Sequence, residues 1–374
     1  MNRLCVISAA ALSGRMLALA PADGALCRLA RLGRRTIQPV CPAVTCTMQA
    51  TVTTGQPPGV HGIVANGLYF AEQGRVSFWE QSNRLLEAPR FWRRGTLAGA
   101  CRTAMLFWQN SMFGAADVVL TPRPAHTPDG RTISTCYSDP PGLYDSLRGE
   151  LGEFPLKHYW GPLAHLASSE WIAAAAERVW QRERPDLQLL YLPHLDYSLQ
   201  KVGPADPSIA GEVAHLDALI GRLAGAVAAD GGRVVVMGDY GITPVGRAVT
   251  PNVALRDAGL LTVRDAAGTD LLDVGEARAF ALVDHQVAHV YCGDDAAAGQ
   301  AAEVLRGLDG VAEVIDLAKA DPLGLRHRRS GRLIALAQPD AWFAYYFWHD
   351  PARAPAFART VDIHRKPGYD PCEK

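Results

Sequence analysis

The sequence predicts an α/β protein in which a central, mostly parallel sheet is flanked by helices on both faces. Apolar runs of strand length alternate along the chain with longer helical stretches. This alternation favours parallel strands with right-handed crossovers, because two parallel strands need a long connection that is usually a helix. With 374 residues and 48% hydrophobic content, the chain is also long enough to bury a large core.

The predicted elements follow in chain order from apolar patterns and turn residues. Residues 4–7 read as the first buried strand, and a late segment over about residues 277–337 again alternates strand and helix. Between them, a helix, a strand, a helix and a strand are expected over residues 168–184, 187–192, 212–229 and 233–237. Ser168 and Ser169 are expected to cap the first of these helices, and the glycines at 231 and 232 to end the second.

Polar side chains follow two of the predicted strands. His194 and Asp196 come after one strand, and Asp239 and Tyr240 come after the next. In a parallel sheet with helices on both faces, ligands bind beyond the carboxyl ends of the strands. We therefore expect the functional site among these residues.

We expect one α/β domain over residues 1–374. Residues 66–160 differ in amino-acid composition, since they are rich in aromatic residues and then in Pro and Gly. They are expected to cover the site as an insertion or long loops. The formal net charge is -1, from 37 basic and 38 acidic side chains, which gives no overall field to attract a nucleic acid polymer or an anionic membrane. Recognition of a phosphorylated partner must therefore be local.

The N-terminus and the cysteines bear on localisation. The apolar residues 4–11 after Arg3 faintly resemble a secretory signal, but Arg15 interrupts the run, and a first strand is the favoured interpretation. The eight cysteines form no CxxC pair and indicate buried thiols in a reducing compartment. Because no run reaches about 18 apolar residues, no transmembrane helix is expected. The prediction is a cytoplasmic protein.

The most informative stretch surrounds Thr45. It starts with a proline three residues earlier and continues into Thr-Gly-Gln-Pro-Pro-Gly-Val-His-Gly-Ile over residues 54–63 and then Asn66. This stretch resembles the nucleophile segment of the type I phosphodiesterase and nucleotide pyrophosphatase family of the alkaline phosphatase superfamily. The resemblance implies an alkaline-phosphatase-like fold, with Thr45 as nucleophile and Asn66 as phosphate-binding residue. Without the downstream match, Thr45 would more simply cap a helix that Gly55 ends.

Two later segments resemble the family's metal-binding turns. Asp196 matches a metal-binding aspartate, but Gln200 stands where the family has a histidine four residues later. Asp239 matches a second aspartate, and Tyr240 replaces the histidine that follows it. Gln200 and Tyr240 are thus possible substitutes at ligand positions, although an amide oxygen is a poor ligand for zinc. By themselves, the two aspartates could be a helix cap and a turn residue.

The metal site implied by the resemblance is incomplete. His364, in a segment similar to the family's C-terminal histidine ligand, is the third matched ligand. Ala10 occupies the position of a metal-binding aspartate after the first strand. Asp196, Asp239 and His364 therefore represent three of the six ligands that the resemblance implies. A divalent metal, most simply zinc, is predicted, as one or two ions, and a single ion or a site completed by other groups is favoured over a regular two-metal site.

These residues predict a metal-assisted hydrolase of a phosphodiester, pyrophosphate or phosphonate bond in a small metabolite or nucleotide. Thr45 would form a covalent phosphothreonine, while the helix start and Asn66 hold the phosphate oxygens. The alternative is a degenerate family member that binds a phosphorylated metabolite or a partner protein without turnover.

Other charged or histidine-containing segments have weaker functional interpretations. His285 and His289 could supply missing ligands, although one exposed and one packed histidine is an equally good interpretation. Basic clusters at residues 90–94 and 326–329 could attract an anionic substrate, but such clusters are more often solvated loops.

Overall fold

A computed structural model describes residues 3–129, 131–159, 161, 163–355 and 358. The chain divides into two compact units. Unit 1 comprises residues 1–39, 48–55 and 81–242, and unit 2 comprises residues 40–47, 56–80 and 243–374. The division falls within one helix, α3 (Thr45–Thr54).

Unit 1 is built on a six-stranded sheet with the order β10-β1-β9-β4-β5-β8. The first five strands are parallel, and β8 pairs antiparallel with β5. The strands are β1 (Leu4–Ala9), β4 (Thr103–Leu106), β5 (Val118–Pro122), β8 (Cys136–Asp139), β9 (Leu187–Leu192) and β10 (Arg233–Gly238), with a short hairpin of β6 (Ala125–His126) and β7 (Thr132–Ile133) beside them in sequence. The predicted strands at residues 4–7, 187–192 and 233–237 and their parallel arrangement are confirmed.

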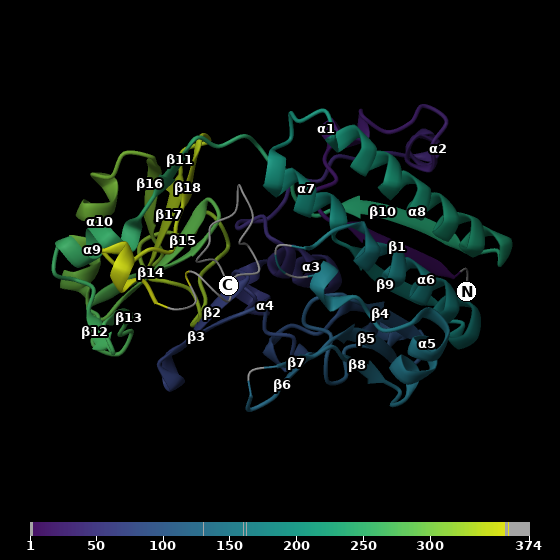
Figure 1. The fold of residues 1–374 in the computed structure, drawn as a ribbon, viewed down its shortest axis with the longest axis horizontal. Coiled ribbons are helices and arrows are strands. Elements are labelled where there is room, and N and C mark those ends of the chain that lie inside the picture. The colour runs from purple at the N-terminus through teal and green to yellow at the C-terminus, as the bar shows by residue number, and fades with distance from the viewer. Residues whose placement is uncertain (1–2, 130, 160, 162, 356–357, 359–374) are drawn as a thin grey trace. The chain divides into compact units, whose positions relative to one another are not determined.

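Helices cover both faces of this sheet, as predicted. Two consecutive residues of β4 point to opposite faces of the sheet. Leu106 packs into one hydrophobic cluster with α6 and α8, whereas Met105 packs into a second cluster with Trp92. Figure 1 shows α6 and α8 running along the sheet, and α3 adds Val52 to the second cluster. The helices of the unit are α1 (Gly14–Leu17), α2 (Ala25–Leu32), α5 (Leu143–Leu151), α6 (Leu166–Glu183), α7 (His194–Val202) and α8 (Ile209–Ala229).

The predicted caps of α6 and α8 are wrong in detail. α6 begins after His165, whose side chain accepts a hydrogen bond from the backbone of Ala167. Ser169 lies inside the helix and accepts from the backbone nitrogen of His194 instead. α8 ends at Ala229 with Asp230 as its cap, one residue before the glycine pair. An imidazole nitrogen can accept a backbone hydrogen bond as a hydroxyl does, which composition alone does not reveal.

Unit 2 has an antiparallel sheet with the order β14-β15-β17-β16. The helices α9 and α10 pack against it around an apolar core that includes Phe280, Leu305 and Phe343. The elements are α4 (Pro58–His61), β2 (Gly67–Phe70), β3 (Arg75–Phe78), β11 (Arg247–Val249), α9 (Pro251–Asp257), β12 (Val263–Ala266), β13 (Thr269–Leu272), β14 (Ala279–Asp284), β15 (Val287–Cys292), α10 (Asp295–Arg306), β16 (Val311–Asp316), β17 (Leu333–Ala337) and β18 (Ala341–Phe343).

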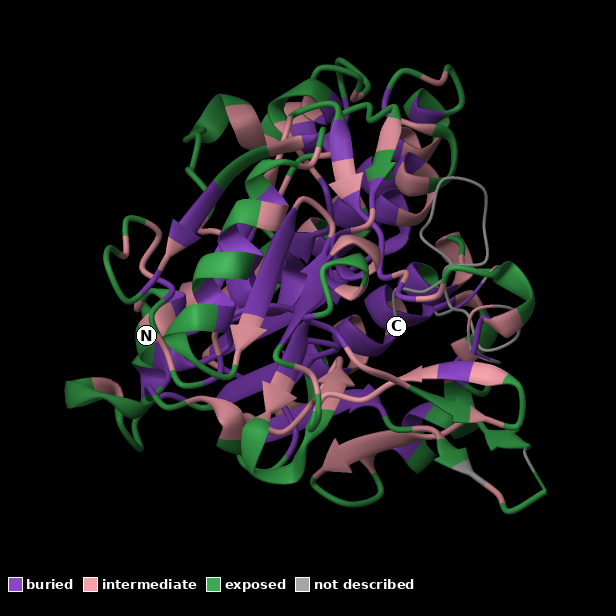
Figure 2. Ribbon diagram, turned by 90° about the vertical axis from the view of Figure 1, so that its left-hand side faces the viewer, coloured by how far each residue is buried: buried purple, intermediate pink, exposed green. Residues whose placement is uncertain are grey.

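Several strands are buried along their whole length. β5 and β9 are buried along their whole length, and Figure 2 shows buried strands through the interior of the molecule. Residues 66–160, expected to cover the site, supply β2 and β3 to unit 2 and β4, β5 and β8 to the sheet of unit 1. In the part of the chain that the structure describes, no helix is both long and apolar enough to cross a membrane.

Candidate active site

Thr45 is the first residue of α3. The next residue, Cys46, links this helix start to Asn66 by a hydrogen bond. The backbone nitrogen of Cys46 donates to Asn66 Oδ1 at 3.2 Å. Thr45 and Asn66 are each only 4% exposed. A hydroxyl at this position lies at the positive end of the helix dipole, where unpaired backbone N–H groups favour a phosphate oxygen. Gly55, at a φ of 64°, follows the last residue of the helix, as predicted.

Asp284 fixes Asn66 and was missed by sequence reasoning. Its Oδ2 accepts from the backbone nitrogen of Asn66 at 2.7 Å, and its Oδ1 accepts from Asn66 Nδ2 at 3.2 Å. Asp284 ends β14 and is 1% exposed. Because 218 residues separate the two partners in sequence, no local pattern could have paired them. The chain Asp284, Asn66 and Cys46 N–H thus ties the unit 2 sheet to the start of α3.

The cysteine beside Thr45 is not a competing nucleophile. Burial, and secondarily the charge of Asp284, raise the pKa of the Cys46 thiol far above its ordinary value. A thiol attacks phosphorus or carbon as its thiolate, which is suppressed here. Cys46 therefore contributes its backbone N–H, and not a thiolate, to this helix start.

The segment between Thr45 and Asn66 is hydrogen-bonded to residues 324–329, which include the basic loop at residues 326–329. The backbone nitrogen of Gly59 donates to the carbonyl oxygen of Gly324 at 2.7 Å, and the Arg329 guanidinium donates to the carbonyl oxygen of Gly62 at 2.9 Å. Gly62 ends α4 with a φ of 77°, where a Cβ would also meet Arg329 at 2.9 Å. Arg329 is 4% exposed, so this arginine is a structural support rather than a solvated cation.

Of the two histidines His285 and His289, one is packed in the interior and the other is exposed. His289 is buried, with its Nδ1 accepting from the backbone nitrogen of Gly331 at 3.2 Å and its Nε2 3.2 Å from the carbonyl oxygen of Val64. Both ring nitrogens are thus used by the backbone. The side chain of His285 is 42% exposed, in the turn between β14 and β15.

The predicted ligand Asp196 lies in unit 1, in the first turn of α7. Its Oδ1 accepts from the Tyr240 hydroxyl at 2.9 Å, and its Oδ2 accepts from Gln200 Nε2 at 2.8 Å. Gln200 is four residues further along α7 and so lies on the same face of the helix. Asp196 is only 7% exposed. The two residues that replace family histidines therefore act as hydrogen-bond donors to this carboxylate.

Asp239, the other predicted ligand in unit 1, directly follows β10 and is 2% exposed. Its Oδ1 accepts from the backbone nitrogens of Ala11 at 3.0 Å and of Tyr240 at 3.1 Å. Its Oδ2 has no hydrogen-bond donor among the described residues. Burial, together with the charge of Asp196, raises the pKa of Asp239 to about 7. Gly238 allows this approach, because a Cβ there would lie 1.9 Å from the carbonyl oxygen of Leu12.

The described residues offer one open carboxylate oxygen toward a cation, but not a set of ligands that could hold it. Asp239 Oδ2 is a buried oxygen that lacks a donor, which is what a cation would satisfy. Both oxygens of Asp196 already accept hydrogen bonds, and Ala10 is a buried apolar residue. Within the described ranges, no group of three or more His, Cys, Asp or Glu side chains could hold a metal ion. The predicted ligand His364 lies outside the described residues.

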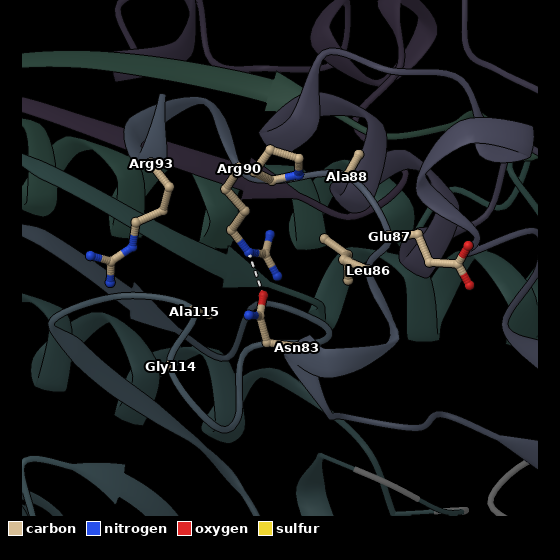
Figure 3. A pocket seen from close by; sticks show the side chains of 9 residues that line it. Asn83, Leu86, Glu87, Ala88, Arg90, Arg93, Gly114 and Ala115 are labelled. Carbon is tan, nitrogen blue, oxygen red and sulfur yellow. Dashed lines mark hydrogen bonds between the residues drawn. The ribbon is translucent and has the colours of Figure 1, made fainter. Parts of the chain in front are cut away.

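The second basic cluster, at residues 90–94, is also structural at its centre. Arg90 is 3% exposed and donates from Nε to Asn83 Oδ1 at 3.0 Å. Its terminal nitrogens donate to Thr53 Oγ1 and to the carbonyl oxygen of Asn110, each at 2.6 Å. Both Arg90 and Arg93 line a hollow of about 300 Å³. Figure 3 shows the Arg90 side chain turned to Asn83.

The fold and site define a class of protein. In unit 1, a parallel sheet carries carboxylates after β9 and β10, the two strands that flank β1. Unit 2 has a buried threonine at a helix start, next to a clamped asparagine. This combination fits hydrolases that act on phosphate esters. The chain belongs to the type I phosphodiesterase / nucleotide pyrophosphatase family, whose model matches residues 24–370. It is an enzyme of this hydrolase family, as the resemblance implied.

Solved structures of low sequence identity share the fold. Phosphonoacetate hydrolase from Sinorhizobium meliloti 1021, in complex with phosphonoformate, has a TM-score of 0.63 and 18% identity over 92% of this chain and 83% of that chain. Murine ectonucleotide pyrophosphatase / phosphodiesterase 5 has a TM-score of 0.64 and 15% identity over 94% of this chain and 82% of that chain. An inactive variant of the murine protein in complex with AMP has a TM-score of 0.63 and 14% identity, over 92% of this chain and 80% of that chain. No sequence among the curated proteins matched the chain.

Proposed function

We propose that the chain hydrolyses a phosphodiester, pyrophosphate or phosphonate bond in a small metabolite or nucleotide, with Thr45 as the nucleophile. The observation that carries this proposal is the buried start of α3, where the backbone N–H of Cys46 holds Asn66 beside Thr45. Related folds were solved with phosphonoformate and with AMP, both small phosphorus-containing anions. The formal net charge of -1 agrees with recognition by such a local site rather than by a broad basic surface.

In the proposed reaction, Thr45 Oγ1 attacks phosphorus, and the bond from phosphorus to the leaving group breaks. The hydroxyl proton is lost and the leaving group gains a proton. Water then attacks the phosphothreonine, which releases the phosphorus product and restores Thr45. Asn66 Nδ2, which has one hydrogen bond to Asp284, would direct its other N–H to a phosphoryl oxygen.

Asp239, with His364 as the predicted partner, would hold a divalent cation. When bound, such a cation neutralises charge that develops during phosphoryl transfer. Zinc is the proposed metal, since imidazole and carboxylate are ligands that zinc accepts. The cytoplasm remains the predicted compartment.

The test is hydrolysis of a nucleoside 5′-nitrophenyl phosphodiester by the purified chain and its Thr45→Ala variant. We expect kcat/KM to fall by about 10³-fold or more, because the covalent route is lost. Thr45→Ser should retain measurable turnover, since it keeps a hydroxyl. Acid quenching during turnover should trap a phosphorylated peptide that contains Thr45.

Thr51→Ala is the matched control, because it removes a threonine hydroxyl from the same helix, outside the proposed site. It should keep activity within about threefold, a change below 1 kcal/mol in transition-state energy. Full activity in Thr45→Ala would disprove the covalent mechanism. Tight binding of AMP with no hydrolysis of any of the three bond types would instead identify a binding protein without turnover.

A further inference from the structure

Residues 14–37 of unit 1, called the basic segment below, comprise α1, α2 and the first residues after α2. They contain five arginines and one acidic residue, Asp23, which gives a formal charge of +4 in a chain whose net charge is -1. The arginines are Arg15, Arg28, Arg31, Arg34 and Arg35. The charge of the whole chain therefore conceals a strongly positive local segment.

The positive charge of the basic segment is not neutralised by the protein. All five arginines are exposed, and none of them forms an ion pair with a carboxylate of the described residues. Arg28 and Arg31 donate to the backbone carbonyl oxygens of Asp23 and Ala22. Because a guanidinium group has five N–H donors, most of these donors are left for an external anion.

Large apolar side chains are exposed among these arginines. Leu32, the last residue of α2, is 86% exposed, Ile37 is 51% exposed and Leu19 is 41% exposed. Another side of α2 does pack, since Leu29 contacts the main hydrophobic cluster of unit 1. Leu32 thus lies outside the core, next in sequence to Arg31. Exposed apolar side chains among cations are typical of a surface that enters a membrane interface.

The basic segment is held on the folded part of unit 1. Both α1 and α2 pack against α8, and Figure 1 shows the two helices beside it. Asp217 of α8 accepts hydrogen bonds from the backbone nitrogens of Ala25 at 3.0 Å and Leu26 at 2.7 Å. Beyond α2, Arg34 lies against the start of α1, where its Nη2 would be 3.8 Å from a Cβ on Gly14. The segment is therefore a fixed surface rather than a loose tail.

We propose that the basic segment binds the surface of an anionic lipid bilayer. The guanidinium groups pair with lipid phosphates, while Leu32 and Ile37 enter the interfacial layer. Charge complementarity selects anionic over neutral lipid, and each arginine at the surface contributes about fivefold in affinity. This inference goes beyond the proposed function and does not depend on the chemistry at Thr45.

A lipid surface suits the basic segment better than a nucleic acid does. Proteins bind single-stranded nucleic acids with aromatic side chains that stack on the bases, and residues 14–37 contain no Phe, Trp or Tyr. A phosphate backbone also offers no apolar layer for the exposed leucines and isoleucine, whereas the acyl boundary of a bilayer does.

The test is sedimentation of the full chain with two kinds of vesicle, phosphatidylcholine alone and an equimolar mixture of phosphatidylcholine and phosphatidylglycerol. We expect binding to the anionic vesicles only, with an affinity that falls as NaCl is raised. The triple variant Arg31→Gln, Arg34→Gln and Arg35→Gln should weaken this binding by about 100-fold. Leu32→Ser keeps the charge and should weaken binding by about 10-fold without changing its salt dependence.

A second triple variant is the matched control: Arg148→Gln, Arg182→Gln and Arg184→Gln. It removes the same charge from exposed arginines of unit 1 that are already paired with carboxylates, at 3.1, 2.6 and 3.7 Å. This variant should keep the vesicle affinity within about threefold. Thermal unfolding followed by circular dichroism checks that every variant is folded.

Absence of binding to the anionic vesicles at low salt would overturn the inference, and so would equal binding to phosphatidylcholine alone. Equal losses in the two triple variants would show that net charge, rather than the basic segment, drives binding. Tighter binding to polyuridylate than to the anionic vesicles would assign the segment to RNA instead. None of these measurements involves turnover, so a failure of the proposed function at Thr45 would be seen separately.

Discussion

Asn66 is held through its side chain and its backbone. Its Oδ1 accepts from Cys46 N–H, while its Nδ2 and its backbone nitrogen both donate to Asp284. This leaves the amide with one remaining N–H to present to a ligand. Such fixation matters because a hydrogen-bond donor stabilises developing charge best when it needs no reorganisation.

We therefore predict that Asp284→Asn lowers kcat/KM for the nitrophenyl phosphodiester by about 10- to 100-fold. An amide at this position turns one of its own donors toward an Asn66 donor, which costs about 1–3 kcal/mol. If Asp284 acts through Asn66, Asp284→Asn should add little to the loss in Asn66→Ala. Asp309→Asn is the control, because it makes the same change in unit 2 at a side chain that is 87% exposed. Losses that simply add in the double variant would contradict this coupling.

Site residues that lie close together in the sequence were easier to predict than residues that only the fold brings together. Thr45 and Asn66 lie 21 positions apart within one recognisable stretch, whereas Asp284 comes from β14 and is linked only by the fold. The donor roles of Tyr240 and Gln200 were equally hidden, because a sequence shows that a histidine is replaced but not which atom the new side chain contacts. The bond from Tyr240 to Asp196 depends on the carboxyl ends of β9 and β10 being brought together through β1, whereas Gln200 reaches Asp196 within α7.

At the scale of single elements, a buried arginine is hydrogen-bonded to α3 near the C-terminal end of the helix. Arg90 reaches Thr53 Oγ1, the carbonyl oxygen of Asn110 and Asn83 Oδ1 at once. Burial lowers the pKa of Arg90 to about 9. The negative end of the α3 dipole offsets part of the cost of burying this cation.

We predict that Arg90→Met reduces the free energy of unfolding by about 2–5 kcal/mol, because two buried acceptors and one half-buried acceptor lose their donor. Arg90→Lys should recover only part of the loss, since one ammonium group does not reproduce the planar fork of a guanidinium. Arg93→Ala is the matched control: its side chain is 42% exposed, and it should change stability by less than about 0.5 kcal/mol. Urea denaturation measures all three. Equal losses in the Met and Ala variants would contradict the structural role of Arg90.

Strands were easier to predict than helix ends, for a physical reason. β9 is buried at every position, so its apolar run is continuous and its bounds match the predicted 187–192. The start of α6 depends instead on which side chain reaches a free N–H group. His165 does so, and the serines expected there lie inside the helix. Helix caps are set by local geometry that several residue types satisfy.

At the scale of the whole molecule, the candidate functional residues belong to two different units. Thr45, Asn66 and Asp284 belong to unit 2, and Asp196 and Asp239 to unit 1. The sequence predicted β1, β9 and β10 of the unit 1 sheet, because alternating apolar runs and crossover helices produce a regular pattern. It did not predict β4, β5 and β8, which lie in the stretch expected to cover the site. It did not predict that the late segment forms an antiparallel sheet, β14-β15-β17-β16, since antiparallel strands that pack under helices show similar apolar runs.

The pH dependence of unfolding offers a test at this scale. Burial lowers the pKa of His289 from 6.5 to about 4. The folded chain therefore keeps this histidine neutral, while the unfolded chain binds a proton as the pH falls below about 6.5. Proton uptake by the unfolded state removes stability between about pH 6.5 and pH 4, and above that window there is no loss. At about pH 5 the expected loss from this one residue is about 2 kcal/mol relative to pH 7.5.

His289→Gln should reduce the difference in unfolding free energy between about pH 7.5 and pH 5 by about that 2 kcal/mol. Glutamine does not titrate, yet it keeps one donor and one acceptor for Val64 and Gly331. His194, whose pKa burial also lowers to about 4, contributes equally in both proteins and cancels in the comparison. The control is Asn252→Ala, which removes a buried, hydrogen-bonded amide of the same unit but no titratable group, and which should lower stability equally at both pH values. A His289→Gln variant that loses as much stability on acidification as the unaltered chain would show that this buried imidazole is protonated in both states.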